Sequence, residues 1–416
     1  MDSSDGARAH ATFSEEWCTH HFDHLSPELG EDLHPLLGYL REHCPVAHSD
    51  QYGGYWMVTR YHDVMRVAQD WDTFSSAQGV TVPMPPESVA MIIPEMVDPP
   101  LHRQYRKLIN TYFTQSAVAH WEPGVRDIVT RLIDDVIETG HAEFMEDFAR
   151  PFPGMVFFEQ VIHAPTDDIR ELLRLTALGA NPALPDSADA RVEIIDWVSA
   201  LVDQRRRQGP QGDVIDGVLA AEIEGRPITE PEIMAILQLL VFGGLDTTAG
   251  ALGHMMTRFC REPKIPGLLR ERPELLPLAV EELMRLDGPL AYLGRTATRD
   301  VELGGQSTKK GDKVLISWTS ANHDSTEFAN AETFALDRPN NRHLGFGVGP
   351  HRCAGSNLAR MDLRVAISEL VRRLHGLRLE DPDTPIDIHP GFSRAPSAVR
   401  IAFAPGAREG AGAATP

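Results

Sequence analysis

The chain of 416 residues is 42% hydrophobic and 24% charged, which is typical of a globular protein with a large core. Its formal net charge of −21 disfavours nucleic acids and anionic membrane surfaces as partners. The polar, acidic residues 1–17 predict neither a signal peptide nor a membrane anchor. The longest uncharged apolar run, 233–245, is shorter than the roughly 20 residues that a bilayer span needs.

The cysteines are scattered and show no CxxC pairing, which favours free thiols in a reducing, cytoplasmic compartment. They are Cys18, Cys44, Cys260 and Cys353. No repeat and no Ser/Gly-rich linker divides the chain, so we expect one large domain over residues 26–404. A flexible N-terminus of residues 1–25 and a disordered, Gly/Ala-rich tail of residues 405–416 are expected to flank it.

The N-terminal part of the chain predicts short elements. We expect a helix near Leu33–Glu42, a strand over Tyr55–Thr59 after two glycines, and a helix over Tyr61–Gln69. Residues 75–97 are rich in Val, Met, Ile and Pro but lack a clear period. They form either the lid of a pocket or a loop packed on the core, and the sequence leaves both interpretations open.

A double proline at 99–100 marks the start of the next helix. His102 and Arg106 are four residues apart and therefore share one face of that helix. This pair suits a carboxylate or a phosphate, although a solvated basic face is the simpler interpretation. Residues 122–207 are predicted to be helical with several breaks, one of them at Asn181–Pro185.

The stretch Glu230–Cys260 predicts a helix that is apolar on nearly every side and therefore buried. The adjacent glycines at 243–244 cost about 1 kcal/mol each relative to alanine inside a helix. A buried helix tolerates them where it kinks or where another group approaches its backbone closely. An acid, Asp246, and a hydroxyl, Thr247, follow at once, and Thr247 can bond the carbonyl of Gly243.

A further helix over Ala279–Leu286 places Glu282 and Arg285 on one face. Strands over Thr296–Leu303 and Lys313–Ile316 are predicted after it, with a turn at two glycines between them. The chain as a whole therefore predicts a mostly α fold with small β-sheets.

The loop Phe346–Gly355 surrounds Cys353 with glycines and a proline, and an amphipathic helix to about Leu374 follows it. A helix N-terminus favours an anion, so we expect the thiol to ionise readily. The glycines let the backbone approach a broad planar cofactor more readily than a small substrate. A buried structural cysteine is the alternative.

The spacing Phe-x-x-Gly-x-x-x-Cys-x-Gly, filled by Phe346, Gly349, Cys353 and Gly355, resembles the haem-ligand loop of the cytochrome P-450 monooxygenases of the soluble bacterial type. The resemblance implies a single cytochrome P-450-type fold, with haem b between the long central helix and the helix that follows the loop. Cys353 is then the iron ligand, and Phe346, Gly347 and Gly355 contact the cofactor.

The resemblance also assigns roles to residues outside the loop. It implies that His102, Arg106, Arg295 and His351 bind the haem propionates. Glu282 and Arg285, completed by Arg338, match a structural triad that supports the haem loop.

In this resemblance Thr247 orders the proton of a water or hydroperoxide, and Asp246 relays protons from solvent. An ordinary buried ion pair for Asp246 and a structural helix bond for Thr247 are the alternatives.

The same resemblance implies a pocket with mostly apolar walls, which suits a small or medium hydrophobic molecule such as a terpenoid or an aromatic compound. Phe242 is expected to crowd it and so to favour a compact substrate. The pocket residues are Ile92, Ile93, Leu239, Phe242, Gly243, Ala291 and Leu293, with Val80, Val82, Leu290 and Tyr292 as further candidates.

The implied reaction is the insertion of one oxygen atom of O2 into a C–H bond. Because no flavin or iron–sulfur module is visible, electrons are expected from NAD(P)H through a ferredoxin reductase and a ferredoxin. A basic patch for the ferredoxin is predicted at Arg103, Arg106, Lys107 and Arg352.

Several other functions fit this sequence less well. A haem-thiolate peroxygenase or a non-catalytic haem sensor is disfavoured by the retained Asp246 and Thr247. A zinc site or a cysteine hydrolase is disfavoured because Cys353 has no paired ligand spacing around it.

Overall fold

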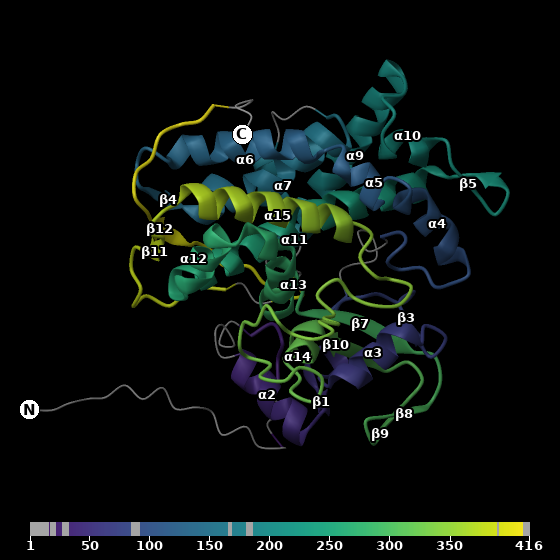
Figure 1. The fold of residues 1–416 in the computed structure, drawn as a ribbon. Helices are drawn as coiled ribbons and strands as arrows, with labels where there is room; N and C mark the ends of the chain where they lie inside the picture. The colour runs from purple at the N-terminus through teal and green to yellow at the C-terminus, as the bar shows by residue number, and fades with distance from the viewer. Residues whose placement is uncertain are drawn as a thin grey trace, which may run out of the picture.

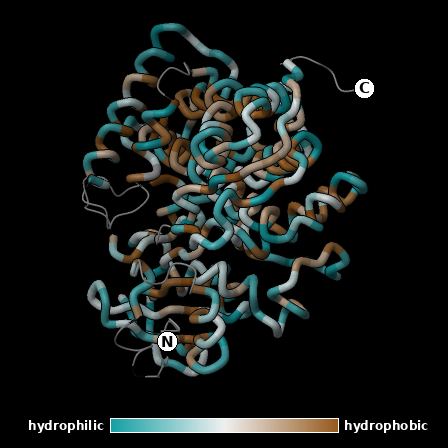
Figure 2. Tube along the Cα trace, turned by 90° about the vertical axis from the view of Figure 1, so that its left-hand side faces the viewer, coloured by the Kyte–Doolittle hydropathy of each residue, from teal (hydrophilic) through white to brown (hydrophobic). Residues whose placement is uncertain are grey.

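The computed structural model describes residues 16, 22–26, 33–84, 92–164, 169–179, 186–388 and 391–410. Within these residues the fold is mostly helical with small sheets, as predicted. Figure 1 shows a large helical part and, below it in that view, a smaller part built on the main sheet. Figure 2 shows hydrophobic residues in the interior of both parts.

The helices before the central one are α2 (Leu33–His43), α3 (Tyr61–Gln69), α4 (Leu101–Asn110), α5 (Gln115–Ala119), α6 (Glu122–Val136), α7 (Pro151–Val156), α8 (Ile169–Gly179), α9 (Ser187–Gln208) and α10 (Val214–Leu219). The central helix and those after it are α11 (Glu230–Arg261), α12 (Lys264–Glu271), α13 (Leu276–Asp287), α14 (Trp318–Asn322) and α15 (Ser356–Arg373).

The main sheet has five strands in the order β1-β2-β10-β7-β3, in which only β2 and β10 run parallel. Their bounds are β1 (Val46–Ser49), β2 (Tyr55–Val58), β10 (Lys313–Ser317), β7 (Tyr292–Ala297) and β3 (Phe74–Ser75). The small sheets contain β4 (His141–Glu143), β11 (Arg378–Leu379) and β12 (Arg400–Ala402), the pair β5 (Glu222–Ile223) and β6 (Arg226–Pro227), and the pair β8 (Val301–Leu303) and β9 (Gln306–Thr308).

Helix α11 runs through the middle of the helical part and contacts α7, α8 and α9 (Figure 1). A capping box of Thr229 and Glu232 satisfies backbone N–H groups at its N-terminus. By length and composition α11 could cross a membrane, but half of its most apolar window is buried inside the protein. Its contacts are those of a core helix. Helix α15 packs beside it against α6, α12 and α13.

Buried residues begin before the predicted domain boundary at residue 26. Phe22 is fully buried against α2 and β2, and Ser49 donates its hydroxyl to the carbonyl of Phe22 at 2.6 Å. His24 is also buried and contacts the ring of Tyr55. These packed side chains show that the expected flexible segment does not extend to residue 25. Residues 1–15 and 17–21 lie outside the described residues.

The predicted disorder of the C-terminal tail is wrong for residues 405–410. The backbone N–H groups of Glu409 and Gly410 donate to the carboxylate of Asp134 on α6 at 3.1 and 2.8 Å. These bonds fasten the segment to the surface of the helical part. Residues 411–416 lie outside the described residues.

The strand predicted over Thr296–Leu303 is two strands. Strand β7 ends at Ala297, and β8 begins at Val301 and pairs with β9 across the predicted glycine turn. The N–H of Thr298 donates to the carbonyl of Thr73 at 2.9 Å on the β3 side of β7, and β8 pairs with β9 instead of continuing the main sheet. Asp300, a poor strand former, lies between the two strands, so the break did have a local sequence signal.

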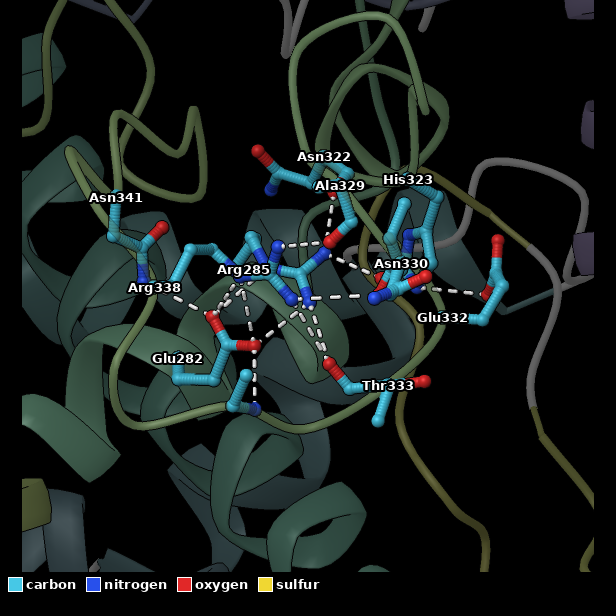
Figure 3. A network of polar contacts seen from close by, with 12 residues as sticks. Glu282, Arg285, Asn322, His323, Ala329, Asn330, Glu332, Thr333, Arg338 and Asn341 are labelled. Carbon is cyan, nitrogen blue, oxygen red and sulfur yellow. Dashed lines mark hydrogen bonds and ion pairs between the residues drawn. The ribbon is translucent and has the colours of Figure 1, made fainter.

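The predicted residues Glu282, Arg285 and Arg338 lie together in a buried network (Figure 3). The Glu282 carboxylate accepts two bonds from Arg285 at 2.9 Å and two from Arg338 at 3.1 Å. Glu282 and Arg285 are each 1% exposed. The buried carboxylate of Glu282 is thus balanced by two guanidinium groups, as buried charges require.

The network reaches the backbone that leads to Cys353. Arg285 donates to the carbonyls of Asn322 and Ala331 at 2.8 and 2.7 Å. The side-chain oxygen of Asn322 accepts the N–H of Leu344 at 2.6 Å. Helix α13 thus holds the irregular segment that enters the cysteine loop.

Replacing Glu282 with alanine leaves two enclosed guanidinium groups without their carboxylate, which costs about 3–5 kcal/mol. We expect the urea midpoint of unfolding, followed by circular dichroism, to fall clearly. Glu274→Ala is the control, because the side chain of Glu274 is 62% exposed and, among the described residues, pairs only with exposed Arg272; its effect should be small. Equal shifts in the two variants would contradict the supporting role of Glu282.

Candidate functional site

A cavity of about 340 Å³ lies between α11, the start of β7, the segment around residue 92 and the cysteine loop (Phe346–Gly355). Most of the residues that the sequence singled out meet on its wall. They are Ile92, Arg106, Leu239, Phe242, Gly243, Asp246, Thr247, Leu293, Arg295, Phe346, Gly347, His351, Cys353 and Gly355.

The cysteine loop is held by its own backbone. The N–H of Cys353 donates to the carbonyl of Phe346 at 2.9 Å, and that of Arg352 donates to the carbonyl of Gly349 at 3.1 Å. Gly349 has a φ of +77°, which favours glycine, and a Cβ there would lie 2.7 Å from the carbonyl oxygen of Ala68. The loop therefore presses against α3 and fixes Cys353 directly before α15.

The electrostatics of Cys353 differ from the prediction. The thiol is accessible from the cavity but enclosed by protein, and this burial raises its pKa, although the N–H of Gly355 and the charges of Arg106 and Arg352 act in the opposite direction. The helix N-terminus is therefore not the dominant influence on the pKa of this thiol. A bound metal cation would favour the thiolate, because coordination deprotonates a thiol outright.

Two histidines and two arginines converge at one side of the cavity. The rings of His102 on α4 and His351 in the cysteine loop lie 4.4 Å apart. Arg106 lies one turn after His102, and Arg295 on β7 is 2% exposed and donates to the adjacent carbonyl of Gly294 at 2.7 Å. The structure thus brings together all four predicted propionate contacts.

The histidines of this cluster have ring nitrogens that make no hydrogen bond to any described residue. Both ring nitrogens of His102 and Nδ1 of His351 are buried and have no hydrogen-bond partner among the described residues. Burial, with the charges of nearby arginines such as Arg106, lowers the pKa of His102 to about 4 and that of His351 to about 2. Unpaired buried donors beside two guanidinium groups suit a ligand with two carboxylates, and this observation fits the propionates of haem b.

Two acidic residues beside this cluster were missed in the sequence. Glu95 lies with a carboxylate oxygen 3.8 Å from Nδ1 of His351, and burial raises the pKa of Glu95. The carboxylate of Asp98 accepts the N–H of Ser76 at 3.0 Å, and the Ser76 hydroxyl lies 3.2 Å from Nε2 of His351. Asp98 therefore orients the loop behind His351; its only sequence signal was its place before the double proline.

On the opposite wall, Thr247 donates its hydroxyl to the carbonyl of Gly243 at 3.1 Å, as predicted. Asp246 accepts the hydroxyl of Ser393 at 2.5 Å. Helix α11 runs unbroken through the two glycines, and close approach explains Gly244 but not Gly243. A Cβ at Gly244 would lie 3.1 Å from the ring of Phe157, whereas one at Gly243 would meet no atom within 4 Å.

Four of the predicted pocket residues do not lie on the cavity wall: Ile93, Ala291, and the further candidates Val82 and Tyr292, which are buried in the core with residues of α2 and β2. Ile93 is 2% exposed, donates its N–H to the carbonyl of Ala235, and faces the core beside α11. Ala291 is fully buried among residues of α2 and β2. Their neighbours Ile92 and Leu290 do line the cavity. The prediction therefore found the correct apolar segments but not which of their side chains face the cavity.

Besides Glu95, the cavity wall has two charged residues that the sequence did not single out. Asp362 on α15 is 2% exposed, one of its carboxylate oxygens has no partner among the described residues, and burial raises its pKa well above the usual value. Arg191 reaches the wall from α9. Neither belongs to a local pattern, so no sequence signal could have found them.

The fold and the site together define the class of haem-thiolate proteins. A family profile described as Cytochrome P450 matches residues 268–403. Nocardicin C N-oxygenase from Nocardia uniformis subsp. tsuyamanensis is 35% identical, with 84% of this chain and 90% of that protein covered. Cytochrome P450 130 from Mycobacterium tuberculosis is 33% identical, with 85% and 91% covered.

Solved structures agree with these relatives. Cytochrome P450 CYP101C1 has a TM-score of 0.82 at 28% identity and covers 92% of this chain and 96% of its own. CYP109E1 from Bacillus megaterium has a TM-score of 0.82 at 26% identity, with 91% and 99% covered. The chain belongs to the cytochrome P450 family. Members of this family are haem-thiolate monooxygenases that use haem b and O2.

Replacing Gly349 with alanine should displace the cysteine loop, because the new Cβ overlaps the carbonyl of Ala68. Gly311→Ala is the matched control, because Gly311 also has a positive φ, +94°, and alanine there costs a similar backbone strain of about 1 kcal/mol. A Cβ at Gly311, however, meets nothing within 4 Å. We expect Gly349→Ala to retain clearly less haem per chain by absorbance. Equal haem content in both variants would contradict the close approach.

Proposed function

We propose that this protein hydroxylates a small or medium hydrophobic molecule as a ferredoxin-dependent monooxygenase of the cytoplasm. The observation that carries the proposal is one cavity with Cys353 on one wall and the pair Asp246–Thr247 on another. Haem, when bound, supplies the oxidising chemistry, because thiolate ligation favours cleavage of the O–O bond. The remaining steps belong to side chains of this chain.

The residues around the cavity divide into holding and proton-transfer roles. Cys353 ligates the iron, while Phe346, Gly347 and Gly355 form the surface against the cofactor. The two carboxylates of the cofactor are bound by four side chains whose donors are otherwise unpaired or enclosed, those of His102, Arg106, Arg295 and His351. Apolar side chains, among them Leu239, Phe242 and Leu293, exclude water and hold the substrate by contact.

Thr247 and Asp246 are placed to manage protons. The Thr247 hydroxyl donates to the Gly243 carbonyl at 3.1 Å, and it can instead donate to a group in the cavity. Asp246 is half-buried and bonds the Ser393 hydroxyl, which links it to the segment after residue 390. An acid beside an alcohol in an apolar wall supplies protons where water is scarce.

Electrons come from a separate iron–sulfur protein that docks near Cys353. In this proposal the docking surface is supplied by three exposed cations on α4 and the cysteine loop of an otherwise acidic molecule: Arg103, Lys107 and Arg352. Arg106 does not belong to this patch: it is half-buried, lines the cavity and donates to the carbonyl of Arg352 at 2.6 Å.

The proton role of Thr247 predicts that Thr247→Ala keeps its haem but makes less product. We expect the share of NAD(P)H electrons lost as hydrogen peroxide to rise, and product per NAD(P)H to fall about tenfold or more. Thr257→Ala is the matched control, since Thr257 donates to Gly253 at 2.9 Å on the same helix and is not on the cavity wall. Unchanged coupling in Thr247→Ala would refute the role.

The docking patch predicts slower reduction after charge reversal. We expect Arg352→Glu and Arg103→Glu to lower the rate of the first electron transfer about tenfold at low ionic strength, with the difference shrinking in high salt. Lys310→Glu, an exposed cation in the turn before β10, is the control. Stopped-flow reduction by a ferredoxin measures the rate, and identical rates in all variants would argue against this surface.

The monooxygenase assignment itself is tested on the purified haem-loaded protein. The reduced protein with carbon monoxide should show the absorption band of an iron–thiolate adduct, and Cys353→Ala should lose it. Addition of ferredoxin, its reductase and NAD(P)H should then oxidise a compound from a hydrophobic panel that shifts the spin state of the wild type. A wild type without the thiolate band would overturn the assignment.

A further inference from the structure

Arg191 is an isolated charge on the cavity wall. It lies in the first turns of α9, is half-buried, and lines the same cavity as Cys353 and Thr247. The other two cavity arginines, Arg106 and Arg295, sit in the cluster with the histidines His102 and His351. Arg191 lies outside this cluster and takes part in neither the proposed cofactor binding nor the proposed proton transfer.

The side chain of Arg191 is held in place by packing. Its guanidinium carbon lies 5.4 Å from the centre of the Phe242 ring. A Cβ at Gly179 would lie 3.1 Å from that ring and 3.2 Å from Cγ of Arg191. The glycine at the end of α8 therefore leaves room for the ring and the arginine stem to lie together, where three helices meet.

The guanidinium lacks an anionic partner within the described part of the chain. No salt bridge pairs Arg191 with a carboxylate there, and its Nε is buried without a hydrogen-bond acceptor. Burial lowers the pKa of Arg191. The stacked ring of Phe242 offsets part of the cost of burial, but it accepts no hydrogen bond in the plane of the fork.

A partly buried fork of N–H donors in an apolar wall recognises a flat anion. A carboxylate accepts two parallel bonds from one guanidinium, and the low polarity of the wall strengthens them. A phosphate dianion needs more than one cation to balance it, and Arg191 stands alone here among the described residues. The chemistry of this wall therefore selects a monoanionic carboxylate on an otherwise apolar molecule.

We propose that Arg191 binds the carboxylate of an apolar organic acid and so defines the substrate class. This inference rests on the proposed monooxygenase function and deepens it.

The position of Arg191 also restricts where the acid is oxidised. Phe242, whose ring packs against the guanidinium of Arg191, precedes Asp246 by one turn, or about 6 Å of helix rise. A carboxylate held there keeps its own α-carbon away from Thr247 and presents a carbon farther along the molecule. We expect the product to be hydroxylated remote from the carboxylate.

The test uses the haem-loaded protein and ω-(imidazol-1-yl)alkanoates of increasing chain length, each compared with its methyl ester. The imidazole nitrogen ligates the iron and shifts the Soret band, so every probe gives a readable Kd. At the chain length that reaches Arg191, we expect the acid to bind about tenfold more tightly than its ester. Shorter acids should show no such preference.

Variants separate recognition from packing. Arg191→Ala should abolish the preference for the acid while leaving ester binding within about twofold, and Arg191→Lys should retain part of it. Arg191→Glu should instead favour the matching ω-amine. Arg206→Ala, on the same helix but 45% exposed and paired with Glu230, is the control and should behave as wild type.

The outcomes distinguish this inference from the proposed function. A thiolate band with carbon monoxide but no acid preference at any chain length would overturn the role of Arg191 alone. A preference that survives Arg191→Ala would also overturn it. Loss of the thiolate band in the wild type would instead overturn the monooxygenase assignment itself, whatever the acids do.

Discussion

The position of Cys353 depends on a carboxylate that never touches the cavity. Residues 323–345 contain no helix or strand, so they cannot hold themselves by a regular ladder of backbone bonds. Two guanidinium groups, of Arg285 and Arg338, bond the carbonyls of this segment instead, and both depend on Glu282 for their charge balance. A buried ion pair thus replaces secondary structure as the support of the cysteine loop.

The features that the sequence predicted well are local ones. The helix over Tyr61–Gln69 ends where its apolar period ends, and the bond from Thr247 to Gly243 needs only helical geometry four residues apart. The cysteine loop and the triad were found because their residues keep fixed spacings. In each case the information lies within a few turns of chain or in a family pattern.

The features that were missed depend on distant packing. Ile93 and Ala291 sit in the predicted apolar segments, but which side of an irregular segment faces a cavity is set by α11 and α2. Glu95 and Arg191 look like ordinary surface charges in the sequence, and only the tertiary structure encloses them. The same holds for the thiol of Cys353, where enclosure by protein outweighs the helix end.

The strap formed by residues 405–410 has a practical consequence for protein engineering. It covers the ion pair between Asp134 on α6 and Arg373 at the end of α15, and Arg373 also donates to the carbonyl of Ala407. Shortening the chain at residue 404 to aid crystallisation would admit water to this pair and loosen the far end of the helix that begins beside Cys353. Affinity tags and fusion partners therefore belong beyond the strap, which should be kept whole.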